Sequence, residues 1–188
     1  MGSGSEVTKQ AARMILTDDN FGTLVHAVEL GRITYDKIVS FVRVQMTQLM
    51  SLVLLFVAAT VFNVNEGMAL TPLMVIFVGL VVVIFPVVVV ANDPGAPDIM
   101  SRPPRDPKVP LTNTAAVWRW VLYGVVRFLP AFACLVWGPD MPSIDAPSAS
   151  MTMAFAVIAM GAVFGGLVLR RDPASGLSAP LLKTIAIL

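Results

Sequence analysis

Long uncharged stretches alternate with short polar ones along the chain. The first uncharged stretch continues a segment whose pattern begins as that of an amphipathic helix. Within residues 19–62, apolar side chains recur at intervals of three and four, with charged residues between them as far as Arg43. No charge follows until Glu66, and this run can cross about 30 Å of hydrocarbon at about 1.5 Å per residue. We predict one helix over 19–62, with a cytosolic stalk over 19–43 and a membrane span from about residue 44.

Polar residues along the stalk give three further expectations. Asp19 is expected to cap the helix, because its carboxylate can accept from the first free backbone N–H groups. Arg32 and Asp36 are four residues apart, so we expect an ion pair worth a few tenths of a kcal/mol. His26 has no partner at metal-ligand spacing, and we expect it to lie on a solvated helix face.

The second apolar segment, predicted over 70–91, is rich in β-branched residues. An isolated strand cannot satisfy its backbone in lipid, so we predict a helix. Its start at Thr71-Pro72 is typical of a first helical turn. Pro86 lies in its second half and is expected to kink or locally unwind it.

Two more spans are predicted, over 114–137 and 151–169. The earlier one has Trp118 and Trp120 near one end and Trp137 at the other. Trp118 and Trp137 would lie about 28 Å apart along a helix. That spacing is typical of aromatic belts at the two membrane interfaces.

Composition agrees with an all-α integral membrane protein. Of the 188 residues, 56% are hydrophobic and 13% are charged, about half the charged fraction of a typical soluble domain. A net charge of +1 argues against nucleic acid as a partner. The single cysteine, Cys134, excludes an internal disulfide, and we expect it to pack as a small hydrophobic residue.

The basic residues predict the orientation. Lysines and arginines precede the first span, lie in the proline-rich loop 92–113 and follow the fourth span. The other two connections hold Glu66, Asp140 and Asp145 and no basic residue. By the positive-inside rule, the four spans cross the cell membrane with both chain termini in the cytoplasm.

A cation pathway needs oxygen ligands at membrane depth, and none of the four spans holds an Asp or Glu. The first span offers neutral oxygens only. Hydrogen bonding between packed helices is the favoured interpretation of these side chains, and ion coordination is the alternative. The ion-pathway candidates are Gln45, Thr47, Gln48, Ser51 and the helix-breaking Pro86.

Arg127 is the one charge predicted deep in the bilayer, nine residues beyond Trp118. Such a charge should face protein or water. It can act as an anion contact or as an electrostatic barrier to cations; equally, it can pair with Gln45 or Gln48 or extend toward an interface. In the fourth span, Gly161 and Gly165 form a small-xxx-small pair that permits close helix approach.

No enzyme motif appears in these 188 residues. There is no phosphate-binding G-x-x-x-x-G-K-[ST], no HExxH and no nucleophile elbow. We therefore predict no catalytic residue, no cofactor and no metal site.

Several stretches resemble the C-terminal membrane region of a P-type cation-transporting ATPase of the calcium-pump-like bacterial group. "GSGSEVTKQAARMILTDDNF" resembles the end of that family's phosphorylation domain, and "AVELGRITYDKIVSFVR" its fifth-helix stalk. "LTPLMVIFVGLVVVIFPVVVVANDP" resembles the sixth helix, "PDIMSRPPRDPK" the loop after it, and "SMTMAFAVIAMGAVFGGLVLRRDP" the eighth. The resemblance implies that 1–18 is a remnant of the phosphorylation domain, that 44–169 holds helices five to eight, and that 170–188 is a cytosolic tail and truncated ninth helix.

The same resemblance shows which family motifs these residues lack. The phosphorylated Asp-Lys-Thr-Gly, the actuator Thr-Gly-Glu-Ser and the Gly-Asp-Gly loop have no counterpart. Where the calcium pumps carry ion ligands, this sequence has only apolar residues: Leu49, Leu52, Gly79, Val82 and Val83.

Three functions follow, in order of preference. The first is a membrane-domain fragment of such an ATPase, a remnant or one part of a split pump, unable to drive transport alone. The second is a small membrane subunit that binds and modulates a full-length ATPase, and the third is a passive channel. The partners expected are the lipid bilayer and a full-length ATPase or the missing pump domains, with a homo-oligomer also open.

Overall fold

Four long helices dominate the computed structural model, which describes residues 3–104, 112, 114–139 and 148–169. Every regular element in these residues is helical. The helices long and apolar enough to cross a membrane are Phe21–Val61, Pro72–Asn92, Thr114–Trp137 and Ala149–Leu169. They match the four predicted segments to within two residues at each end, which confirms an all-α, multi-pass membrane protein. The predicted tail, 170–188, lies outside the described residues.

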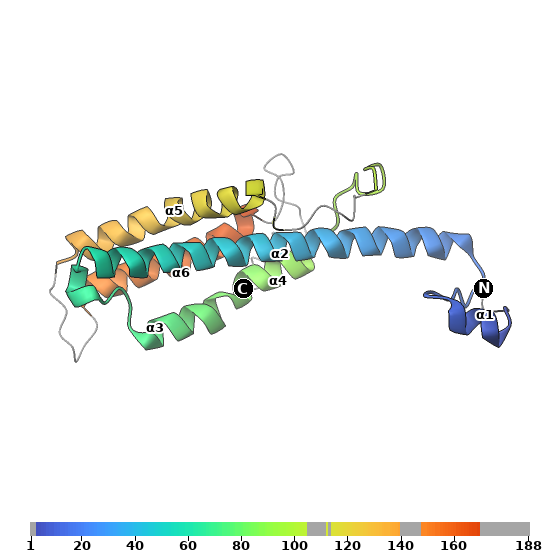
Figure 1. The fold of residues 1–188 in the computed structure, drawn as a ribbon, viewed down its shortest axis with the longest axis horizontal. Helices are drawn as coiled ribbons and strands as arrows, with labels where there is room; N and C mark the ends of the chain where they lie inside the picture. Colours follow the sequence, from blue (N-terminus) through green and yellow to red (C-terminus); the bar gives the residue numbers. More distant parts are fainter. Residues whose placement is uncertain (1–2, 105–111, 113, 140–147, 170–188) are drawn as a thin grey trace. The chain divides into compact units, whose positions relative to one another are not determined.

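The chain divides into two compact units. The first comprises Met1–Asp36 with Gly95–Arg105, and the second comprises Lys37–Pro94 with Asp106–Leu188. The long helix α2 (Phe21–Val61) contributes residues to both (Figure 1).

In the first unit, helix α1 (Glu6–Ala11) precedes α2. The expected Asp19 cap is wrong: Asp19 has a φ of 50°, and α2 begins two residues later. Asn20 does the capping, because its side-chain oxygen accepts from the Gly22 N–H at 2.8 Å. The hydroxyl of Thr23 donates to Asp18, and this bond lowers the pKa of that carboxyl.

The expected pair between Arg32 and Asp36 is also replaced by longer-range contacts. Arg32 donates to the backbone carbonyls of Ile99 and Arg102, each at 2.9 Å. Asp36 instead lies 3.2 Å from Arg102, which also contacts Asp98 at 2.9 Å and lowers the pKa of that carboxyl. Arg32 lies close to the backbone carbonyls of Ile99 and Arg102, which need hydrogen-bond donors. A pair between Arg32 and Asp36 would leave these carbonyls without that donor.

The only histidine, His26, lies on an exposed face of α2, 3.4 Å from Glu29. Within the described ranges, no group of three metal-ligating side chains is present. The predicted solvated position of His26 is therefore confirmed.

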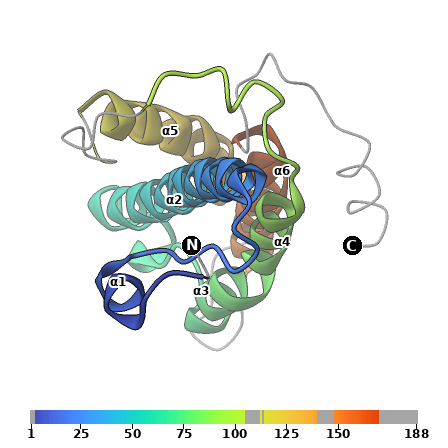
Figure 2. The same ribbon diagram turned by 90° about the vertical axis from the view of Figure 1, so that its right-hand side faces the viewer.

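The second unit holds the helical bundle. After α2 come the short turn η1 (Val64–Gly67), the segment from α3 (Pro72–Phe77) to α4 (Ile84–Asn92), α5 (Thr114–Trp137) and α6 (Ala149–Leu169). Figure 2 looks along the helices and shows α5, α6 and the α3–α4 segment arranged around α2.

The second span is interrupted, as its proline predicts. Thr71 caps α3, its hydroxyl accepting from the Met74 N–H at 3.3 Å. A single wide π-type turn, η2 (Val78–Val82), then separates α3 from α4. Pro86 has no N–H for the carbonyl four residues earlier, and a widened turn just before a proline accommodates that loss.

Small residues bring the bundle helices close together. The buried core includes alanines from three helices, among them Ala59, Ala131, Ala154 and Ala162. A side chain at Gly124 of α5 would meet Met50 of α2. Lipid gives little hydrophobic drive for helices to associate, so close backbone contact supplies the packing energy. Cys134 packs partly buried against this core, as predicted.

Candidate functional site

The polar residues of the first span gather on the buried side of α2. Thr47 and Ser51 are fully buried and Gln48 is nearly so, whereas Gln45 is half-buried. Both hydroxyls donate within their own helix: Thr47 to the Arg43 carbonyl at 2.8 Å and Ser51 to the Gln48 carbonyl at 2.9 Å. Thr47 and Ser51 therefore satisfy themselves locally and need no ion to do so.

Of these four side chains, Gln48 is the one that bonds to another helix. Its amide oxygen accepts a hydrogen bond from Nη2 of Arg127 on α5. The same nitrogen lies 3.4 Å from the Ile158 carbonyl of α6. Of the interpretations open for Arg127, the structure contains the pair with Gln48, and Gln45 takes no part in it.

The Gln48–Arg127 pair leaves several donors without acceptors. Nε2 of Gln48 and the Nε and Nη1 atoms of Arg127 are shielded from solvent and have no hydrogen-bond partner among the described residues. A buried guanidinium whose acceptors here are a neutral side-chain amide and a backbone carbonyl keeps its positive charge uncompensated.

Two glycines on α6 create the space for Arg127. A side chain at Gly161 would lie 3.1 Å from Nε of Arg127, and one at Gly165 would lie 3.5 Å from Nη1. The small-xxx-small pair predicted to bring helices together thus makes room for a charged side chain.

The remaining candidate, Pro86, lies apart from this polar group. It is buried, and a side chain at Gly166 would collide with its ring and Cα. Pro86 therefore packs α4 against α6 in an apolar contact.

The positions at which the resemblance to calcium pumps implies ion ligands do not converge on one point. Leu49 is 49% exposed, and a methyl group added at Gly79 would meet no neighbouring residue within 4 Å. Val82, by contrast, is buried in the apolar core. Arg127 places a positive charge beside the buried amide of Gln48, and this charge disfavours a cation at that point.

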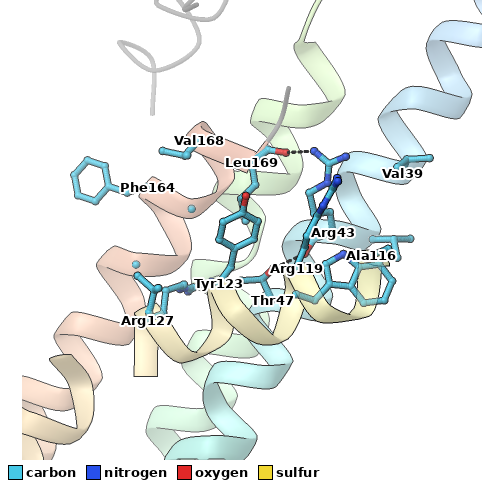
Figure 3. A pocket seen from close by; sticks show the side chains of 15 residues that line it. Val39, Arg43, Thr47, Ala116, Arg119, Tyr123, Arg127, Phe164, Val168 and Leu169 are labelled. Carbon is cyan, nitrogen blue, oxygen red and sulfur yellow. Dashed lines mark hydrogen bonds between the residues drawn. The ribbon is translucent and has the colours of Figure 1, made fainter. Parts of the chain in front are cut away.

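A cleft of about 430 Å³ opens beside Arg127, between α2, α5 and α6 (Figure 3). Among the described residues, three arginines line it and no acidic residue does. Arg43 Nη1 also lies 3.4 Å from the carbonyl of Leu169, at the C-terminus of α6. The lining residues used below are Arg43, Arg119, Tyr123, Val126, Arg127, Phe164 and Val168.

Sequence reasoning missed this cleft. It did not single out Arg119, and it placed Trp120 in an aromatic belt. Trp120 is 7% exposed and lines the cleft, whereas Trp118 and Trp137 are 69% and 84% exposed. The available signal was the spacing of Arg119, Tyr123 and Arg127, which puts all three on one face of a helix.

One comparison with known proteins bears on this fold and site. The family model described as "Cation transporting ATPase, C-terminus" matches residues 67–188, a little under two thirds of the chain. The matched region includes α3 to α6 and begins just after α2.

Proposed function

This chain belongs to the cation-transporting ATPases as part of their C-terminal region, and from this premise we propose that it is a membrane-domain segment of a P-type pump that does not drive transport alone. The family match over 67–188 carries the proposal. The four spanning helices are what such a segment requires. We further propose that residues 19–43, which include the first part of α2, form the cytosolic stalk through which a pump transmits movement to its membrane helices.

The lack of independent activity follows from residue chemistry. ATP-driven transport by these pumps passes through an aspartyl-phosphate, and the 188 residues contain no Asp-Lys-Thr-Gly motif to form it. Among the residues that the structure describes, the buried polar side chains around Arg127 include no carboxylate, which also disfavours a passive cation channel.

A membrane subunit that modulates a full-length ATPase is the second candidate. One side of α2 carries apolar residues four positions apart that the bundle leaves exposed: Leu49, Val53, Val57 and Val61. This stripe suits contact with lipid or with further membrane helices of a pump.

The two candidates differ in where the catalytic domains are encoded. A neighbouring reading frame for phosphorylation and nucleotide-binding domains would favour a split pump. A full-length ATPase that co-purifies from native membranes at fixed stoichiometry would favour the modulator. Purification only as a homo-oligomer would contradict the modulator.

The proposed orientation gives a direct prediction. In a Cys134→Ala background, a cysteine at Glu66 should react with a membrane-impermeant maleimide added to intact cells. A cysteine at Ser101 should react only after the cells are opened, because basic loops remain cytoplasmic. Both sites are at least partly exposed. If the Ser101→Cys variant is labelled in intact cells and the Glu66→Cys variant is not, the proposed orientation is wrong.

A further inference from the structure

The cleft between α2, α5 and α6 concentrates positive charge without compensation. Arg43, Arg119 and Arg127 enter it from two helices, and none of the lining residues that the structure describes is acidic. Of these, Arg127 has two shielded nitrogens without acceptors in the described part of the chain. Like charges in one cavity between membrane helices repel, and an anion in the cavity would offset that repulsion.

The depth of the cleft places its mouth near a membrane interface. Arg43 is the last charge before the uncharged part of α2, and it contacts the final residue described in α6, Leu169. Trp118, one residue from Arg119, is exposed as interfacial tryptophans are. Arg127 lies eight residues further along α5, about 12 Å deeper.

Apolar side chains line the same cleft. Val126, Phe164 and Val168 are 60%, 57% and 69% exposed. Figure 3 shows Phe164 and Val168 on α6, on the side of the cleft away from Val39 of α2. A small, fully hydrated anion would gain nothing from these side chains, whereas an acyl chain would cover them.

We propose that this cleft binds the phosphate headgroup of an anionic phospholipid, with Arg43 and Arg119 as its phosphate contacts. The planar guanidinium groups match phosphate oxygens, and the Tyr123 hydroxyl is a further donor in the wall. Arg127, which is held by its hydrogen bond to Gln48, adds a positive charge at the deeper end of the cleft. A zwitterionic headgroup adds a cation that the arginines repel, so anionic lipid is preferred. This site is independent of the proposed pump function.

The test is native mass spectrometry of the full chain in micelles, titrated with phosphatidylglycerol or with phosphatidylcholine of the same acyl chains. We expect one phosphatidylglycerol to be retained in preference to phosphatidylcholine. Arg119→Gln and Arg43→Gln should each weaken this binding about tenfold, the effect of losing a charge-assisted contact. Arg13→Gln removes the same charge from an exposed position outside the cleft and should leave binding unchanged.

Two further measurements separate the alternatives. Val168→Glu puts a carboxylate in the cleft wall at a position that is 69% exposed, and it should abolish the preference for phosphatidylglycerol. Millimolar inorganic phosphate should not displace the lipid, because it makes no apolar contact. Equal binding by Arg119→Gln and Arg13→Gln, unchanged binding by Val168→Glu, or full displacement by inorganic phosphate would each overturn the proposal.

Discussion

Replacing Gln48 with leucine is expected to lower the free energy of unfolding by about 2–3 kcal/mol, since it removes the side-chain acceptor of a buried guanidinium. Gln48 is 6% exposed, and its amide oxygen accepts from Arg127 Nη2. Without it, that nitrogen retains only the 3.4 Å contact to the Ile158 carbonyl. Equilibrium unfolding in mixed micelles measures the change.

Gln45→Leu is the matched control, because Gln45 lies on the same helix and is only half-buried. We expect a change within about 0.5 kcal/mol. The double variant Gln48→Leu/Arg127→Leu should recover most of the stability that Gln48→Leu loses, since replacing both partners leaves no unpaired charge. Equal losses for Gln48→Leu and Gln45→Leu would contradict the assigned pair.

Gly166→Ala is expected to destabilise the bundle by about 2–3 kcal/mol, because α4 and α6 touch at this point. The added methyl group would overlap the ring and Cα of Pro86, and backbone atoms must shift to relieve it. Pro86 has little freedom to move, since its φ is fixed.

Gly79→Ala supplies the control for this prediction. Gly79 also lies in a helical segment, but a methyl group added there would meet no neighbouring residue within 4 Å. Alanine there should be neutral or should stabilise the helix by about 1 kcal/mol, as helix propensities predict. A Gly166→Ala variant as stable as Gly79→Ala would show that α4 and α6 are not in the contact described.

The spanning helices were predictable because the membrane imposes a strict rule on sequence. Hydrocarbon demands about 20 apolar residues per crossing, so each span is bounded by the nearest charges and turn residues. Pro86 also predicted that the second span would be irregular, although the widened turn falls at Val78–Val82, before the proline.

Contacts between distant residues were not predictable in this way. Arg32 was expected to pair four residues away, but its acceptors lie about seventy residues further along. Arg43 and Arg119 each look like ordinary interface residues, and only the packing of α2 against α5 and α6 brings them into one cleft. A periodic pattern identifies which face of a helix is apolar, but it does not identify the element that packs against that face, which depends on tertiary packing.

ATP hydrolysis by the purified chain reconstituted in liposomes tests the central claim most directly. A membrane segment without a phosphorylation motif should show no vanadate-sensitive hydrolysis and no ATP-driven cation uptake. The same preparation must also unfold cooperatively, which shows that the chain under test is folded. Vanadate-sensitive ATP hydrolysis that scales with the amount of this chain would contradict the account.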